Sequence, residues 1–183
     1  MIVLEGADGA GKTTLLTHLQ RRFPMIDTHE RYSSSVGGPG DSLDIRIATD
    51  MNALWSRAPQ FYDRHPFISE FIYGPIIRGK IKDGLDRIEM LPFRKRFYEE
   101  ALIILCLPPF HEVHKNVNRD PDNQMAGVLP HIGTIYHAYN ELLGNPLLRN
   151  LVWYSYDEHP GPGFVEDQVA RYYDDKKRQR GIA

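Results

Sequence analysis

Met1-Ile-Val-Leu-Glu5 and Gly6-Ala-Asp-Gly-Ala-Gly-Lys-Thr-Thr14 open the chain. The apolar run indicates a strand buried on both faces, and the residues after Lys12 have the apolar spacing of a helix. The segment between them matches G-x-x-x-x-G-K-[ST] at every fixed position. Its glycines allow the backbone to curl, so that successive N–H groups can bind an anion at a helix N-terminus. This stretch predicts a binding loop for the phosphates of ATP, and a turn that binds nothing is the weaker alternative.

Individual residues of this loop have separate expected roles. Lys12 supplies a cation for the terminal phosphates, and the Thr13 hydroxyl can ligate Mg²⁺. We expect Mg²⁺ to arrive with ATP, because the eight histidines are scattered without the spacing of a metal site. The expected ATP-binding residues are Gly6, Asp8, Gly9, Ala10, Gly11, Lys12, Thr13 and Thr14, together with Lys115 and Arg119 from a lid.

The overall composition is that of one soluble domain. The chain has 183 residues, of which 42% are hydrophobic and 25% are charged. A formal net charge of −2 gives no basic field for non-specific nucleic-acid binding. The single cysteine excludes an internal disulfide, and no stretch approaches the length of a membrane span. We therefore expect a cytoplasmic enzyme without a membrane partner.

A second informative stretch is Gln60-Phe-Tyr-Asp-Arg-His-Pro66. A short apolar strand ends there in an acid–base pair and a proline. The carboxyl ends of parallel strands share one edge with the phosphate loop, so Asp63 and Arg64 should lie in the active-site crevice. Asp63 can hold Mg²⁺ through water or accept a proton from an attacking oxygen, and Arg64 can bind a phosphate bidentately. The alternative is an ordinary ion pair between Asp63 and Arg64. Adjacent residues of a strand form such a pair less readily, because their side chains point to opposite faces.

The segment after the apolar run 101–107 has the shape of a nucleotide-kinase lid. A helix over 112–119, a polar loop over 120–127 and a helix over 129–143 are expected there. Such a lid, at about residues 115–130, closes on ATP and brings cations to the migrating phosphoryl group. Because Gly9 offers no arginine in the loop, a lid cation should neutralise the transition state. Arg119 is the first candidate and Lys115 the second, and a solvated helix face is the alternative.

These patterns predict an α/β, P-loop NTPase-like three-layer sandwich over residues 1–183. Helices should cover both faces of a five-stranded parallel sheet that carries the lid. The second strand is expected at 25–28, a helix at 43–55, and a helix at 69–78 broken at its Gly-Pro pair. The glycine-serine segment 33–40 is either a substrate-closing loop or a linker.

The chain resembles the thymidylate kinase and deoxynucleoside kinase group of P-loop enzymes, in the form found in bacteriophages. The resemblance rests on Leu4 to Thr14 and on Asp63-Arg64, and it continues from Ser69 to Gly74. It implies that Asp8 contacts the acceptor sugar, that Asp63 is the catalytic carboxylate, and that Arg64 binds the acceptor phosphate or the transferred phosphoryl group. The Arg-Glu-Pro-Gly segment of many thymidylate kinases is missing, and residues 29–40 stand in its place.

The leading interpretation is an ATP- and Mg²⁺-dependent phosphotransferase acting on a deoxynucleoside monophosphate. The expected catalytic residues are Lys12, Asp63, Arg64 and Arg119, with Thr13 and Asp63 at the metal. The expected acceptor-binding residues are Asp8, Arg64, Phe67, Tyr73 and Arg78, although Phe67 and Tyr73 could equally pack in the core and Arg78 could be solvated.

Three alternatives stay open. These are a deoxynucleoside kinase, a kinase acting on a hydroxymethylated base in DNA, and a nucleotide-binding switch module. The sequence does not identify the acceptor, and a homodimer is compatible with it. A phage origin would place the protein in the host cytoplasm.

Overall fold

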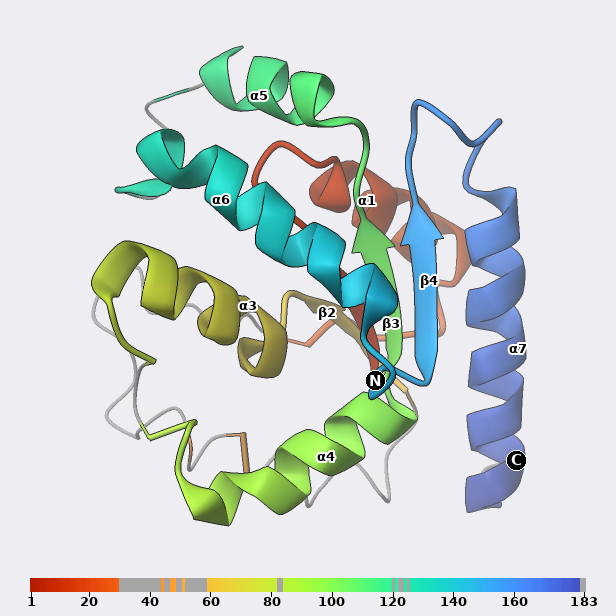
Figure 1. Ribbon diagram of the computed structural model, residues 1–183. Helices are drawn as coiled ribbons and strands as arrows, with labels where there is room; N and C mark the ends of the chain where they lie inside the picture. The colour runs from red at the N-terminus through yellow and green to blue at the C-terminus, as the bar shows by residue number, and fades with distance from the viewer. Residues whose placement is uncertain are drawn as a thin grey trace.

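The computed structural model describes residues 1–29, 44, 47–48, 51, 59–81, 84–119, 121, 124 and 126–181. Within these ranges one parallel sheet has the strand order β2-β1-β3-β4 (Figure 1). Its strands are β1 (Ile2–Glu5), β2 (Phe61–Asp63), β3 (Leu102–Cys106) and β4 (Asn150–Tyr154). The central strands β1 and β3 are buried along their whole length, as their unbroken apolar runs require.

Helices cover both faces of this sheet (Figure 1). On one face α1 (Lys12–Arg22) lies beside α7 (Gly163–Arg180). The contact includes His18 and Arg22 of α1, which both pair with Glu166 of α7. On the other face lie α3 (Pro66–Tyr73), α4 (Leu91–Glu100) and α6 (Val128–Glu141). Helix α5 (Phe110–Arg119) follows β3 and lies beyond its carboxyl end. The shorter helical segments are η1 (Gly74–Arg78), η2 (Ile88–Met90) and η4 (Leu142–Gly144).

The expectation of five strands is wrong, since the described part of the sheet has four. The expected strand at 25–28 is reduced to one isolated parallel bridge between Thr28 and Phe61. Phe61 N–H donates to Asp27 O at 2.9 Å, and His29 N–H donates to Phe61 O at 2.8 Å. The residues after Pro24 form a turn, which leaves too few extended residues beside β2 for a full strand.

Most of the other expected helices and strands in the described ranges are present. The strand in 101–107 and the two helices around 120–127 are confirmed as β3, α5 and α6. The α-helix after β2 ends at Tyr73, directly before the Gly-Pro pair, as expected, and the chain continues as η1, a π-helix. Pro75 has no N–H for the ordinary α-helical bond, and a π-helical turn accommodates this loss. The loop at 33–40 and most of the helix at 43–55 lie outside the described residues.

No helix in the described ranges is both long enough and apolar enough to cross a membrane.

The close approach of the phosphate loop to β3 gives a test of the fold. Gly6 has φ 141°, and a Cβ atom there would overlap the Cys106 carbonyl oxygen. We expect Gly6→Ala to lower the free energy of unfolding by about 3 kcal/mol, measured by urea denaturation. Gly144→Ala is the control, because a Cβ there would meet nothing within 4 Å. Equal stability of the two variants would contradict the close approach.

Candidate active site

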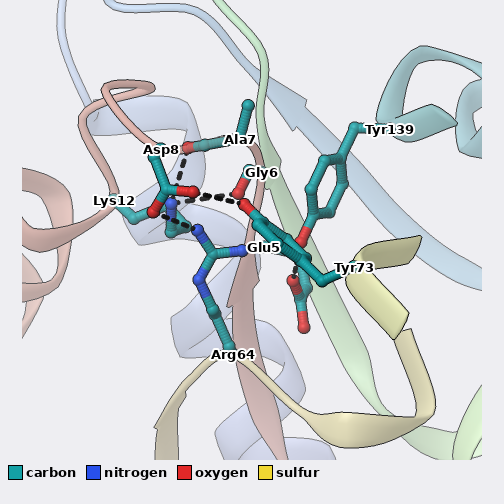
Figure 2. A network of polar contacts seen from close by, with 8 residues as sticks. All are labelled: Glu5, Gly6, Ala7, Asp8, Lys12, Arg64, Tyr73 and Tyr139. Carbon is teal, nitrogen blue, oxygen red and sulfur yellow. Dashed lines mark hydrogen bonds and ion pairs between the residues drawn. The ribbon is translucent and has the colours of Figure 1, made fainter. Parts of the chain in front are cut away.

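The loop between β1 and α1 curls around the ammonium group of Lys12. Lys12 Nζ donates to the carbonyl oxygens of Gly6 at 3.0 Å and Ala7 at 2.7 Å. The side chain is only 7% exposed, and Figure 2 shows it beneath the loop. The Ala10 N–H also donates to Ala7 O, at 3.3 Å. Two groups that the motif assigns to phosphate binding, the Lys12 ammonium and the Ala10 N–H, thus donate to carbonyl oxygens of the loop itself.

Arg64 adopts a left-handed backbone conformation immediately after β2. Its φ is 70°, the one positive value outside glycine in the part of the chain that the structure describes. Such a conformation costs of order 1–3 kcal/mol and persists only where the surroundings fix it. Here the Arg64 N–H donates to Leu4 O at 3.0 Å, which ties the turn to β1. The turn separates Arg64 from Asp63 and brings its guanidinium to the phosphate loop.

The Arg64 guanidinium is the centre of a polar network (Figure 2). It donates to Asp8 Oδ1 at 3.0 Å and to the Tyr139 hydroxyl at 2.7 Å. The Tyr73 hydroxyl donates to Asp8 Oδ2 at 2.7 Å, so both oxygens of this carboxylate are used. The guanidinium carbon lies 4.8 Å from the ring centre of Tyr73 and 6.0 Å from that of Tyr139. Two hydrogen bonds and two aromatic rings therefore fix the orientation of Arg64.

Glu5 extends the network into the core. This carboxylate is fully buried at the end of β1. It accepts hydrogen bonds from the Tyr139 hydroxyl at 2.9 Å and from the His65 N–H at 2.7 Å. Burial raises the pKa of Glu5, against the opposing charge of Arg64. Glu5 and Tyr139 are site residues that the sequence analysis missed, although an acid ending an apolar buried strand was a visible signal.

The charges of the cluster change the proton affinities of its members. Burial opposes the ionisation of Asp8, but the charges of Arg64 and Lys12 outweigh it and lower the pKa of Asp8. Burial, together with the charge of Arg64, lowers the pKa of Lys12 to about 7. A phosphate placed beside Lys12 would favour its charged form. An anion beside Lys12 would therefore change the charge of this amine near neutral pH.

Four of the residues expected at the site come together, namely Asp8, Lys12, Arg64 and Tyr73. Asp63 lies at the end of β2, in register with Leu4. Thr13 and Thr14 are exposed in the first turn of α1. The phosphate-loop and Asp-Arg predictions therefore fall on one edge of the sheet.

Other expected residues lie apart from this network. Phe67 has no exposed surface and packs against His65 and Phe97, with ring centres 5.2 Å and 5.7 Å apart. Its place in the core gives it no surface on which a base could stack, which corrects that expectation. Arg78 bonds to the Glu70 carboxylate between η1 and α3.

The two lid cations lie on α5. Lys115 pairs with Glu112 within the helix at 3.3 Å, and Arg119 is exposed at the helix C-terminus. Their roles in phosphoryl transfer stay predictions.

No family model matches the chain, and no curated protein matches it either. Several solved structures are similar to it, and two of them serve as examples. The YorR protein from Bacillus subtilis, in complex with phosphorylated GDP, has 17% identity and a TM-score of 0.59, over 93% of this chain and 91% of that one. Shikimate kinase from Acinetobacter baumannii, in complex with shikimate, has 17% identity and a TM-score of 0.41, over 96% and 93% of the two chains. The likeness to YorR shows a shared fold, with a parallel sheet between layers of helices.

The lowered pKa of Lys12 predicts how stability depends on pH. Between pH 7 and the ordinary lysine value of about 10.4, the unfolded chain binds more protons at this position than the folded chain. The stability of the wild type should therefore rise with pH relative to Lys12→Met, which cannot titrate. Thermal unfolding of both proteins from pH 7 to about 9.5 measures this difference. A difference that does not change with pH would contradict the buried cation.

Proposed function

We propose that the protein transfers the terminal phosphoryl group of ATP to a nucleotide-type acceptor, with Mg²⁺. One observation carries this proposal: Lys12 inside the phosphate loop and the Asp8–Arg64 pair form a single charge cluster at the carboxyl edge of the sheet (Figure 2). The loop supports binding of the donor phosphates, and the pair beside it supports an acceptor within reach of them.

The residues of the cluster have separate roles in the transfer. The acceptor oxygen attacks the terminal phosphorus, the bond from this phosphorus to the bridging oxygen breaks, and ADP leaves. Where the attacking oxygen is a hydroxyl, Asp63 takes the proton that it loses; where it belongs to a phosphate, which is already ionised, Asp63 would hold Mg²⁺ instead. Lys12 and Arg64 hold the charge that spreads over the phosphoryl oxygens, with Arg119 of α5 as a third cation.

The donor atoms available to a metal suit Mg²⁺. The Thr13 hydroxyl and the Asp63 carboxylate offer hard oxygen ligands, which this ion prefers. No three His, Cys, Asp or Glu side chains of the described ranges gather into a metal site. Two protein oxygens leave room for phosphate and water oxygens, as expected for an ion carried by ATP. When bound, the ion would neutralise charge on the transferred phosphate.

A deoxynucleoside monophosphate is the acceptor that we favour, as in the thymidylate kinases that the sequence resembles. The Arg64 guanidinium can donate two parallel hydrogen bonds to the acceptor phosphate. Asp8 keeps its negative charge because its pKa is lowered, so it can accept a hydrogen bond from a sugar hydroxyl. Both side chains keep part of their surface open, 22% for Arg64 and 28% for Asp8.

One observation favours a second candidate, a neutral acceptor such as a nucleoside. Arg64 is already paired with Asp8, and the second oxygen of Asp8 is taken by Tyr73. An acceptor phosphate must compete with Asp8 for the guanidinium, whereas a sugar hydroxyl need not. The charge of the acceptor therefore separates the two candidates.

Labelled ATP, with Mg²⁺ and a panel of acceptors, tests the function. We expect label on deoxynucleoside monophosphates, and at least a hundredfold less with Lys12→Ala, because several kcal/mol of charge stabilisation is removed. Label on nucleosides alone would select the second candidate. Label on hydroxymethylated DNA, with a Michaelis constant that rises steeply with salt, would indicate a DNA kinase. Slow phosphate release without any labelled acceptor would indicate a switch module and overturn the proposal.

Asp63→Asn tests the proposed proton acceptor. We expect kcat to fall by about 10²–10⁴, because the amide can neither take a proton from an acceptor hydroxyl nor offer Mg²⁺ a charged oxygen ligand. The dissociation constant for ATP, measured by calorimetry, should change little. Asp86→Asn, which alters an exposed carboxylate, is the matched control. Weakened ATP binding with normal kcat at saturation would make Asp63 a binding residue instead.

A further inference from the structure

Helix α5 packs directly on the outside of the phosphate loop. Gly9 has φ 76°, and a Cβ atom there would lie 2.8 Å from Val117 Cγ2 and 2.9 Å from the Val113 carbonyl oxygen. Both neighbours belong to α5, and Val113 and Val117 are fully buried. The loop and the helix therefore touch at a position where only glycine fits.

Asn116 makes this contact polar as well as steric. Its Nδ2 donates to Gly9 O at 3.0 Å and to the Tyr156 hydroxyl at 2.8 Å. A carbonyl oxygen only accepts hydrogen bonds, so the amide must turn its NH₂ group toward Gly9. Tyr156 follows β4, and its ring lies over the start of α1, with carbons 3.0 Å and 3.2 Å from the position of a Cβ on Gly11. One side chain thus links α5, the phosphate loop and the segment after β4.

The bond to Gly9 also fixes the direction of a neighbouring donor. In a planar trans peptide, the C=O and the following N–H point in opposite directions. Holding Gly9 O toward α5 turns the Ala10 N–H toward the inside of the loop, where it donates to Ala7 O at 3.3 Å. This distance is beyond the usual range for an N–H···O bond, so an anion that came closer would take the donor readily.

We propose that Asn116 is a positioning residue of the phosphate loop, that it orients the Gly9–Ala10 peptide toward the polyphosphate of the nucleotide, and that Tyr156 holds its amide in place. The inference rests on the proposed function, in which this loop binds ATP. Asn116 acts through the backbone without touching the ligand. Its ligand class is an inorganic or nucleoside polyphosphate, because the oriented group is one amide of an anion cradle.

Calorimetric titration of the full chain with ATP and with inorganic tripolyphosphate, both with Mg²⁺, tests the proposal. For Asn116→Ala we expect dissociation constants about tenfold higher for both ligands, the effect of losing one oriented hydrogen bond. Asn118→Ala is the matched control on the same helix, since its amide donates to His114 O at 2.7 Å within α5. Its dissociation constants should stay within about twofold of those of the wild type.

Tyr156→Phe separates positioning from general support of the fold. The variant keeps the ring over Gly11 and loses only the hydroxyl, so we expect dissociation constants about threefold higher. Because Tyr156 acts through Asn116, the double variant should bind no more weakly than Asn116→Ala alone. Additive losses would mean independent roles and would overturn the link between the two residues.

The outcomes distinguish failure of this inference from failure of the proposed function. If the wild type binds neither ligand, the proposed function itself fails. If it binds both and Asn116→Ala binds them equally well, the positioning role is overturned. If the wild type binds ATP but not tripolyphosphate, or if Asn116→Ala weakens only ATP binding, the base rather than the polyphosphate is recognised. Either result would also overturn the positioning role. Should Asn116→Ala not fold, an unchanged dissociation constant in Tyr156→Phe would overturn the proposal.

Discussion

The ion pair between Arg64 and Asp8 is the interaction on which the rest of the site depends. Partial burial of either charge alone would be costly, because an isolated ion loses hydration that only a partner returns. Glu5 and Lys12 extend the pair into a cluster of two acids and two bases, in which burial raises the pKa of Glu5 and lowers that of Lys12. Tyr139 completes it by donating to Glu5 while accepting from Arg64. The cluster is thus assembled from β1, the phosphate loop, the end of β2 and α6.

Backbone geometry makes this cluster possible. The parallel register between Leu4 and Asp63 places the end of β2 beside the start of the loop. The left-handed turn at Arg64 then brings its guanidinium over Asp8. The conformational cost of the turn is of order 1–3 kcal/mol, which two charge-assisted hydrogen bonds can offset. The strained backbone conformation therefore belongs to Arg64, the residue whose side chain it orients toward Asp8.

Local patterns predicted much of the fold and part of the site. The strand, loop and helix at residues 2–22, the strand β3 and the helices α5 and α6 follow from apolar runs and glycine placement, which act over a few residues. Asp63 and Arg64 were found because they end a short strand. The predicted number of strands was wrong because Thr28 forms only a single bridge to β2. The apolar pattern at 25–28 does not show how far the turn after Pro24 lets the chain pair with β2.

The residues that sequence analysis missed take their roles from distant contacts. Tyr139 meets Glu5 across 134 positions of the chain, and Asn116 meets Gly9 across 107. Periodicity places Tyr139 on a helix without saying which carboxylate it faces. Phe67 shows the opposite error, since an aromatic residue beside the Asp-Arg pair packs against Phe97 rather than facing a ligand.

An anion bound at this site, as the proposed function requires, would exchange hydrogen-bond partners with the protein rather than meet unpaired groups. Lys12 would give up the carbonyls of Gly6 and Ala7, and the Ala10 N–H would give up Ala7. Each exchange returns only the difference between two hydrogen bonds, which is small for an anion that makes one of them. A polyphosphate would replace several partners at once, and its charge would favour the protonated form of Lys12. Under the proposed function, the arrangement would therefore favour an anion with several linked phosphates over a single phosphate or carboxylate.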